Sequence, residues 1–218
     1  YEDDLVTLYL GDCREVDAWL SADVLVTDPP YGRGWRQGDL RGDAHPGIVG
    51  DEETSVRDWA LDRWGDGRPA IVFGDLMLPP PAGTRQVLVY QKAPGSGIRG
   101  AMGGWRRDLE AVYLLGKWSA ELGGDSSLLR TRARTQSGPS GIVSRSGHPH
   151  AKALDVMQEI IAHCPPEAVA DPFAGSGSTL VAAKLAGRRA IGVEIDEGYC
   201  EAAARRLAQG VLDVAVTA

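Results

Sequence analysis

Asp28 and Tyr31 enclose two consecutive prolines in VTDPPYG, residues 26–32, directly after an apolar run. Proline fixes its own φ and has no N–H to give to a sheet ladder, so the apolar run must end in a rigid turn. Such a turn has two possible uses. It can simply terminate a strand, or it can hold a carboxylate, a carbonyl and an aromatic ring around a planar group that bears an amine.

A glycine-rich turn in ADPFAGSGSTL, residues 170–180, is the second candidate site. An apolar run precedes it and a helical pattern follows, which is the arrangement that places a ligand against a helix N-terminus. Gly175 and Gly177 give G-x-G, but Leu180 stands where a dinucleotide fingerprint has its third glycine, and no Gly-Lys-Ser/Thr of a P-loop follows. The turn therefore favours a nucleoside ligand without a pyrophosphate.

Glu194 ends the next apolar run, in RAIGVEID. An acid at this point can accept hydrogen bonds from ribose hydroxyls, as it does in NAD sites. The alternative is a packing turn between strand and helix, with an exposed glutamate after it.

The elements that must position these residues alternate along the chain. Short apolar runs predict strands, and 3.6-residue periodicity closed by Gly or Pro predicts helices. The expected strands are 5–12, 23–30, 69–75, 85–92, 108–118, 168–173 and 189–196, and the expected helices are 55–65, 148–166, 176–187 and 198–210. Residues 31–50 and 119–147 have the composition of loops. The alternation predicts one α/β domain with a doubly wound, mostly parallel sheet over residues 1–218.

Composition narrows the class of protein. The chain has 218 residues, of which 43% are hydrophobic and 24% charged, as in soluble globular proteins. No apolar run reaches the roughly 20 residues that cross a bilayer, and the acidic start YEDD lacks the basic beginning of a secretory signal. Cys13, Cys164 and Cys200 are an odd, scattered set, which argues against disulfides and a zinc site. We therefore expect a cytoplasmic protein without a metal or a membrane.

Charge is distributed unevenly along the chain. Residues 91–150 contain nine Lys/Arg and four acids, a net charge of +5, whereas the whole chain carries −7. The rest of the chain must therefore carry −12. A basic segment on an acidic body is what a surface facing a polyanion needs, although a solvated arginine-rich loop has the same composition.

These motifs together resemble the DNA amino-methyltransferases that use S-adenosylmethionine. The resemblance rests on DPPY (28–31), DPFAGSGS (171–178) and GVEID (192–196), with support from LGDC (10–13) and HPHAK (148–152). With D-P-P-Y first and the glycine turn last, the order resembles the beta class. This implies a seven-stranded, Rossmann-like methyltransferase sheet with a circularly permuted motif order. The chain departs from the family in its short insert at 119–147, where a full target-recognition domain is usual, and in Ala153 where a proline is typical.

The resemblance also implies roles for individual residues. The catalytic set is Asp28, Pro29, Pro30 and Tyr31, acting on the N6 amine of an adenine flipped out of DNA. D-P-P-Y also occurs with cytosine N4, so that target stays open. The residues expected to bind S-adenosylmethionine are Asp12, Cys13, Lys152, Asp171, Phe173, Ala174, Gly175, Ser176, Gly177, Ser178, Glu194 and Ile195. Asp12 is expected at the adenine, Glu194 at the ribose, and Lys152 at the carboxylate of the methionine part.

DNA is the expected macromolecular partner. Arg130, Arg132 and Arg134 alternate in RTRART, so an extended segment points all three the same way, toward phosphates. A homodimer could supply what the short insert lacks. Two other functions stay open: methylation of an RNA or protein amide, and a non-catalytic nucleoside-binding module.

Overall fold

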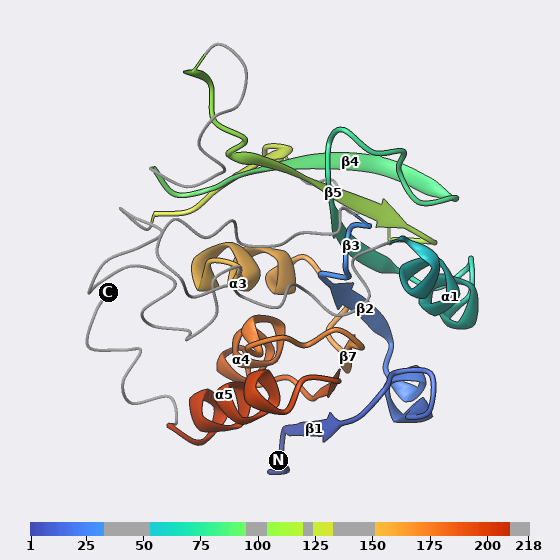
Figure 1. The fold of residues 1–218 in the computed structure, drawn as a ribbon, viewed down its shortest axis with the longest axis vertical. Coiled ribbons are helices and arrows are strands. Elements are labelled where there is room, and N and C mark those ends of the chain that lie inside the picture. The colour runs from blue at the N-terminus through green and yellow to red at the C-terminus, as the bar shows by residue number, and fades with distance from the viewer. Residues whose placement is uncertain (33–52, 95–103, 120–123, 133–150, 210–218) are drawn as a thin grey trace, which may run out of the picture.

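An eight-stranded sheet forms the centre of the computed structural model, which describes residues 1–32, 53–94, 104–119, 124–132 and 151–209 (Figure 1). The strands are β1 (Val6–Leu10), β2 (Val24–Thr27), β3 (Ala70–Gly74), β4 (Thr84–Gln91), β5 (Leu109–Leu115), β6 (Leu128–Arg130), β7 (Val169–Asp171) and β8 (Ala190–Glu194). The helices are the 3-10 helix η1 (Asp17–Ser21), α1 (Ser55–Trp64), α3 (Leu154–Ala162), α4 (Ser178–Leu185) and α5 (Glu197–Ala208).

The strand order is β1-β8-β7-β2-β3-β5-β4-β6. Neighbouring strands from β1 to β3 are parallel, β5 runs antiparallel to both β3 and β4, and β6 is parallel to β4. The prediction of a doubly wound, mostly parallel sheet is confirmed. The expected number of seven strands is wrong, because β6 forms inside 119–147, which the sequence presented as a loop.

The two faces of the sheet carry separate helical layers. On one face Val24 and Val26 pack in a cluster with α3, α4 and α5, and on the other Leu25 packs with Trp19 of η1 and Trp64 of α1. Figure 1 shows the same division, with α3, α4 and α5 stacked on one side and α1 on the other. All four residues of β2 are buried, as an apolar run on both faces predicts for a central parallel strand.

Most predicted elements are present with shorter bounds. The largest difference is α3, which begins at Leu154 although order was expected from residue 148. η1 was not predicted, and the loop expected at 31–50 lies almost wholly outside the described residues.

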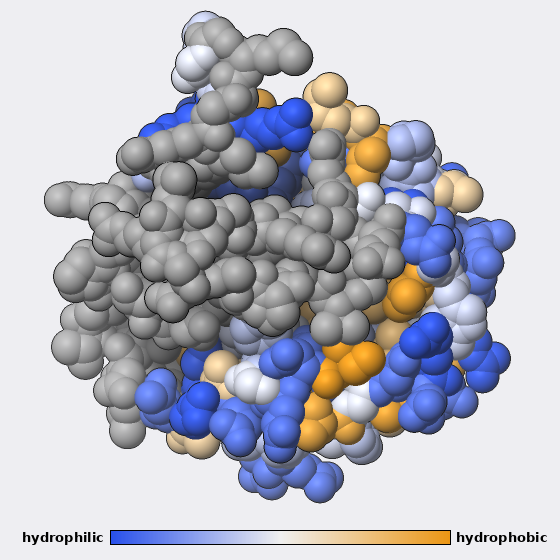
Figure 2. Space-filling model, viewed as in Figure 1, coloured by the Kyte–Doolittle hydropathy of each residue, from blue (hydrophilic) through white to orange (hydrophobic). Residues whose placement is uncertain are grey.

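Hydrophilic residues cover much of the described surface on the face shown in Figure 2, with smaller groups of apolar residues between them. Within the described ranges no helix is long and apolar enough to cross a membrane. The same ranges hold no cluster of three or more His, Cys, Asp or Glu side chains arranged to ligate a metal.

Candidate active site

Four acidic residues meet at one edge of the sheet, where parallel strands end. Asp28 follows β2, Asp171 ends β7, Glu194 ends β8, and Asp12 comes shortly after β1. The strands lie side by side, because β2 pairs with β7, β7 with β8, and β8 with β1. The prediction that the strand ends carrying Asp28 and Asp171 are neighbours is therefore confirmed. Such an edge is where α/β sheets bind their ligands.

The turn after β2 presents Asp28 with both carboxylate oxygens engaged. Tyr31 donates its hydroxyl to Oδ1 at 2.6 Å, and Nζ of Lys152 lies 2.7 Å from Oδ2. Burial, together with the nearby carboxylates of Asp28 and Glu110, raises the pKa of Tyr31 well above its usual value. The tyrosine therefore keeps its proton and acts as a donor to Asp28.

Lys152 lies against Asp28, among charged and aromatic side chains. Its Nζ contacts Asp28, the Tyr31 hydroxyl at 3.2 Å and Oε2 of Glu110 at 3.0 Å, and it stands 4.9 Å from the centre of the Phe73 ring. Burial alone would lower its pKa, but the carboxylates of Asp28 and Glu110 outweigh burial and raise the pKa above its ordinary value. Its role at the carboxylate of the cofactor stays a prediction.

Glu194 accepts backbone hydrogen bonds from the glycine turn after β7 and from the start of α5. Oε2 of Glu194 accepts from the backbone N–H of Gly175 at 2.6 Å, and Oε1 accepts from the N–H of Asp196 at 2.8 Å. Gly177 begins α4 with φ at 78°, in the left-handed region that favours glycine. Each oxygen of Glu194 retains a second lone pair, so the carboxylate can still accept from a ligand hydroxyl.

Arg206 of α5 contacts the same glycine turn through two of its serines. It donates to the carbonyl of Ser176 and lies 3.4 Å from the hydroxyl of Ser178. Burial lowers the pKa of Arg206 to about 10. The two predicted serines are thus buried and bonded to protein, which fixes the backbone of the turn.

A mixed apolar and acidic surface lies beside Glu194. Ile195 is 49% exposed, so its apolar side chain is open to a ligand. Asp12 accepts from the backbone N–H of Arg14 at 2.8 Å and forms a two-point ion pair with its guanidinium. Cys13 is buried, and its carbonyl accepts from the Trp19 ring nitrogen. This combination suits a purine nucleoside, which needs an apolar wall for the ring and acceptors for its hydroxyls and amine.

Asp171 is a buried carboxylate that ties β2 to β7. Its Oδ1 accepts from the hydroxyl of Thr27 at 2.7 Å and from the N–H of Phe173 at 3.2 Å. Burial raises the pKa of Asp171 to about 7, although these hydrogen bonds act in the opposite direction. The side chain therefore orients the strand ends themselves.

This pKa predicts how stability depends on pH. The folded protein holds the Asp171 proton more tightly than the unfolded chain, whose carboxyl has a pKa near 3.8, so its contribution to stability falls as pH rises from about 4 to about 7. Asp171→Asn removes this dependence. We expect the unfolding free energy of the wild type, relative to this variant, to fall by up to about 4 kcal/mol across that range. Urea unfolding at several pH values measures it, and a difference that does not change with pH would show that Asp171 is ionised throughout.

A model of the N6/N4 DNA methylase family matches residues 62–205, more than half of the chain. The chain belongs to this DNA methylase family. The matched range includes the glycine turn and Glu194 but begins after Asp28. The matches to two curated relatives span only 28% and 22% of those proteins' lengths. One of them, the type II methyltransferase M.ScaI of Streptomyces caespitosus, is 39% identical over 67 residues, which is 30% of this chain.

Solved structures agree with the family's fold. The complex of M1.HpyAVI with S-adenosylmethionine superposes with a TM-score of 0.67 at 21% identity, covering 93% of this chain and 99% of that one. The cytosine-N4-specific PvuII DNA methyltransferase gives 0.65 at 17% identity, covering 94% and 87%. At such identities the likeness establishes the fold, a Rossmann-like methyltransferase sheet.

The arginines predicted to face DNA are placed in part. Arg130 ends β6 and Arg132 follows it, and both are exposed, while Thr131 between them donates to Asp155 at 2.9 Å. The alternation predicted for the methylase's basic insert is therefore present at these two positions. Arg134 lies outside the described residues.

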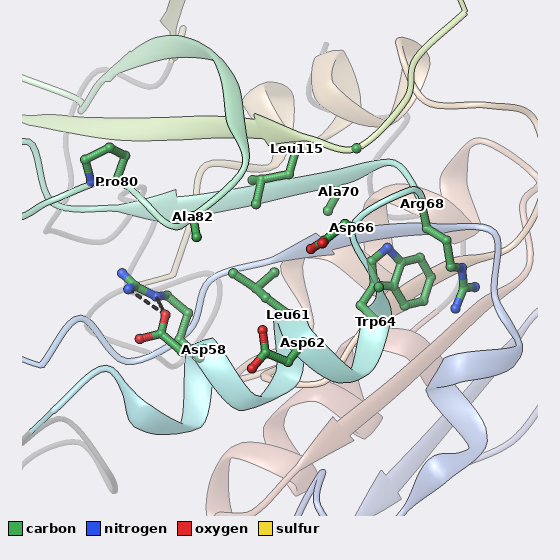
Figure 3. Close-up of a pocket in the computed structure, with 13 residues that line it drawn as sticks. Asp58, Leu61, Asp62, Trp64, Asp66, Arg68, Ala70, Pro80, Ala82 and Leu115 are labelled. Atoms are coloured by element: carbon green, nitrogen blue, oxygen red, sulfur yellow. Dashed lines mark hydrogen bonds and ion pairs between the residues drawn. The ribbon is translucent and has the colours of Figure 1, made fainter.

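A pocket of about 230 Å³ beside α1 contains none of the predicted site residues (Figure 3). It is lined by residues such as Asp62 and Trp64 of α1, Ala70 at the start of β3, and Leu115 at the end of the antiparallel β5. These positions mark the opposite edge of the sheet from Asp28. The candidate site of this DNA methylase is therefore the carboxyl edge, where the motifs meet.

Proposed function

We propose that this protein is a DNA methyltransferase that moves a methyl group from S-adenosylmethionine to the N6 amine of an adenine. The main support for this proposal is that the Asp28–Tyr31 turn, the glycine turn and Glu194 lie next to one another at the same edge of the sheet. We also propose that residues 1–218 act as one domain, with the short basic insert at 119–147 in place of a full recognition domain.

The residues around Glu194 fit the nucleoside part of the cofactor. Ile195 offers an apolar wall, Glu194 is an acceptor for ribose hydroxyls, and Asp12 is an acceptor for the adenine amine. S-adenosylmethionine, when bound, supplies an electrophilic methyl group on a sulfonium. Calorimetry with S-adenosylmethionine and with NAD tests this assignment, and tighter binding of NAD would overturn it.

The turn after β2 makes the amine a nucleophile. Its lone pair is delocalised into the base, so the nitrogen must be held toward tetrahedral geometry. Asp28 and the Pro29 carbonyl accept its two hydrogens, and Tyr31 provides a face for the base, with stacking worth about 1–3 kcal/mol. As the N–C bond formed, the bond from the methyl carbon to the sulfonium would break and leave a neutral thioether. The nitrogen would become cationic and would pass one proton to Asp28 or to water. Reaching this turn requires the base to leave the duplex.

One experiment distinguishes adenine in DNA from two other methyl acceptors, namely cytosine in DNA and an amide or amine in RNA or protein. DNA from a host that expresses the protein is digested to nucleosides and searched for modified bases. N6-methyladenine supports the proposal, whereas N4-methylcytosine would move this chain to the specificity named for the PvuII enzyme. Methyl groups found only in RNA or protein would contradict a DNA target.

The DNA surface is proposed at the same edge of the sheet. β6 runs parallel to β4, Gln91 pairs with both Arg130 and Leu109, and β5 begins there. Trp105 is 80% exposed just before β5, and Arg106 and Arg107 after it are exposed as well. Arginines reach phosphates, and an exposed indole can stack on an unpaired base.

The double variant Arg130→Ala and Arg132→Ala is expected to weaken binding to all duplexes alike. Each lost phosphate contact should lower the slope of log affinity against log salt by about one unit. Fluorescence anisotropy across a salt series measures this, with Arg205→Ala, an exposed arginine of α5, as the matched control. An unchanged slope would remove both residues from the interface, and a loss for one sequence only would mark them as base readers.

A further inference from the structure

Four charged side chains form a connected row from the sheet into the turn after β2. Nζ of Lys92 lies 2.6 Å from Oε1 of Glu110, whose Oε2 lies 3.0 Å from Nζ of Lys152, which in turn lies 2.7 Å from Asp28. The side chains of Glu110 and Lys152 are only 10% and 8% exposed. Neither Glu110 nor Lys92 belongs to a motif that the sequence singled out.

This arrangement conflicts with the role proposed for Asp28. A target amine needs an oxygen of Asp28, yet Tyr31 occupies Oδ1 and Lys152 occupies Oδ2. Each oxygen keeps a second lone pair, but the amine would share its acceptor with a hydroxyl or an ammonium, and movement of Lys152 away from Oδ2 would leave the stronger acceptor. Lys152 has a second carboxylate within 3.0 Å, namely Glu110. Oε2 of Glu110 has no aligned hydrogen bond within the described part of the chain, so that contact is an ion pair with an acceptor still available.

Charge balance gives Glu110 a second effect. The charges of Asp28 and Lys152 alone sum to zero. Such a neutral pair gives little electrostatic stabilisation to a nitrogen that becomes cationic as the N–C bond forms. Glu110 makes the group of three negative by one unit, close to the reacting nitrogen and largely out of water, where such charges act strongly. Lys92 balances Glu110, so the full row of four has no net charge, but Lys92 lies beyond Glu110 and one contact further from Asp28.

We propose that Glu110 is a positioning residue of the methyl-transfer site, which receives Lys152 from Asp28 when the target amine binds and places a negative charge nearer to that amine than the charge of Lys92. This rests on the proposed function. Stability alone does not account for these buried charges, because apolar side chains of similar size often stabilise a fold as much as a buried ion pair or more.

The test compares Glu110→Gln with the double variant Glu110→Gln and Lys152→Met. Glu110→Gln leaves Asp28 and Lys152 in balance, and kcat should fall on the order of 100-fold, while S-adenosylmethionine binding measured by calorimetry stays unchanged. The double variant restores a net negative charge at Asp28 and should recover most of the lost kcat. Glu201→Gln, an exposed carboxylate paired with Arg205, is the matched control.

A second readout needs neither cofactor nor turnover. The nitrogen resonance of the Lys152 ammonium, followed by NMR in the free protein, should shift in Glu110→Gln as well as in Asp28→Asn, because both carboxylates share it. An unchanged resonance in Glu110→Gln, a wild-type kcat in that variant, or a double variant slower than the single one would each overturn the inference. Wild-type protein that transfers no methyl group would instead overturn the proposed function.

Discussion

Asp28→Ala is expected to abolish methyl transfer to DNA, with kcat reduced about 1,000-fold or more, while binding of S-adenosylmethionine stays within about threefold of the wild type. In the proposed function the carboxylate accepts from the target amine, and its contacts are with Tyr31 and Lys152. Filter binding of DNA carrying a labelled methyl group measures transfer, and calorimetry measures the cofactor.

Two further variants separate chemistry from folding. Asp28→Asn keeps one acceptor oxygen but loses the charge opposite Lys152, so its activity should lie between those of the wild type and Asp28→Ala. Asp62→Ala removes an exposed carboxylate on α1 and should retain full activity. Methyl transfer by Asp28→Ala at a near wild-type rate would show that the D-P-P-Y turn does not hold the target.

Gly177→Ala is expected to destabilise the protein by about 2–5 kcal/mol and to weaken S-adenosylmethionine binding. Its φ of 78° costs an L-residue about 1–2 kcal/mol, and a new Cβ would lie 2.9 Å from Cβ of Ala203. The neighbour belongs to the body of α5, so the helix or the turn must move, which adds about 1–3 kcal/mol. Urea denaturation and calorimetry measure the two effects.

Gly83→Ala is the matched control for this variant. Its φ of 77° is nearly the same, but its Cβ would meet nothing within 4 Å. The difference between the two variants therefore isolates the contact with α5. Adding Ala203→Gly to Gly177→Ala should recover part of the loss. Equal costs for Gly177→Ala and Gly83→Ala would refute the close approach of α5 to the turn.

The strands and the meeting of the motifs were predictable because their signals are local. The apolar run before Asp28, the glycine turn and the acid at Glu194 each mark the carboxyl end of a parallel strand, and parallel strands end at one edge. β6 was missed because three residues, Leu128–Arg130, are too short to show a period within a polar segment.

The charged row behind Asp28 was not predictable from one sequence. Glu110 and Lys92 are single charged residues near the ends of β5 and β4, and what brings them to Lys152 is the antiparallel pairing of those two strands. Lys152 itself was found by resemblance, but its contacts with Asp28 and Glu110 were not predicted. Which of two adjacent sites a long side chain enters depends on packing, and the sequence carries no spacing signal for that.

The most direct test of the account is transfer of a tritiated methyl group from S-adenosylmethionine to unmethylated DNA by the purified protein. We expect label in the DNA, recovered after digestion as N6-methyladenine, and its loss in Asp28→Ala with cofactor binding retained. DNA that stays unlabelled, while the protein binds S-adenosylmethionine and labels RNA or protein instead, would contradict the central claim.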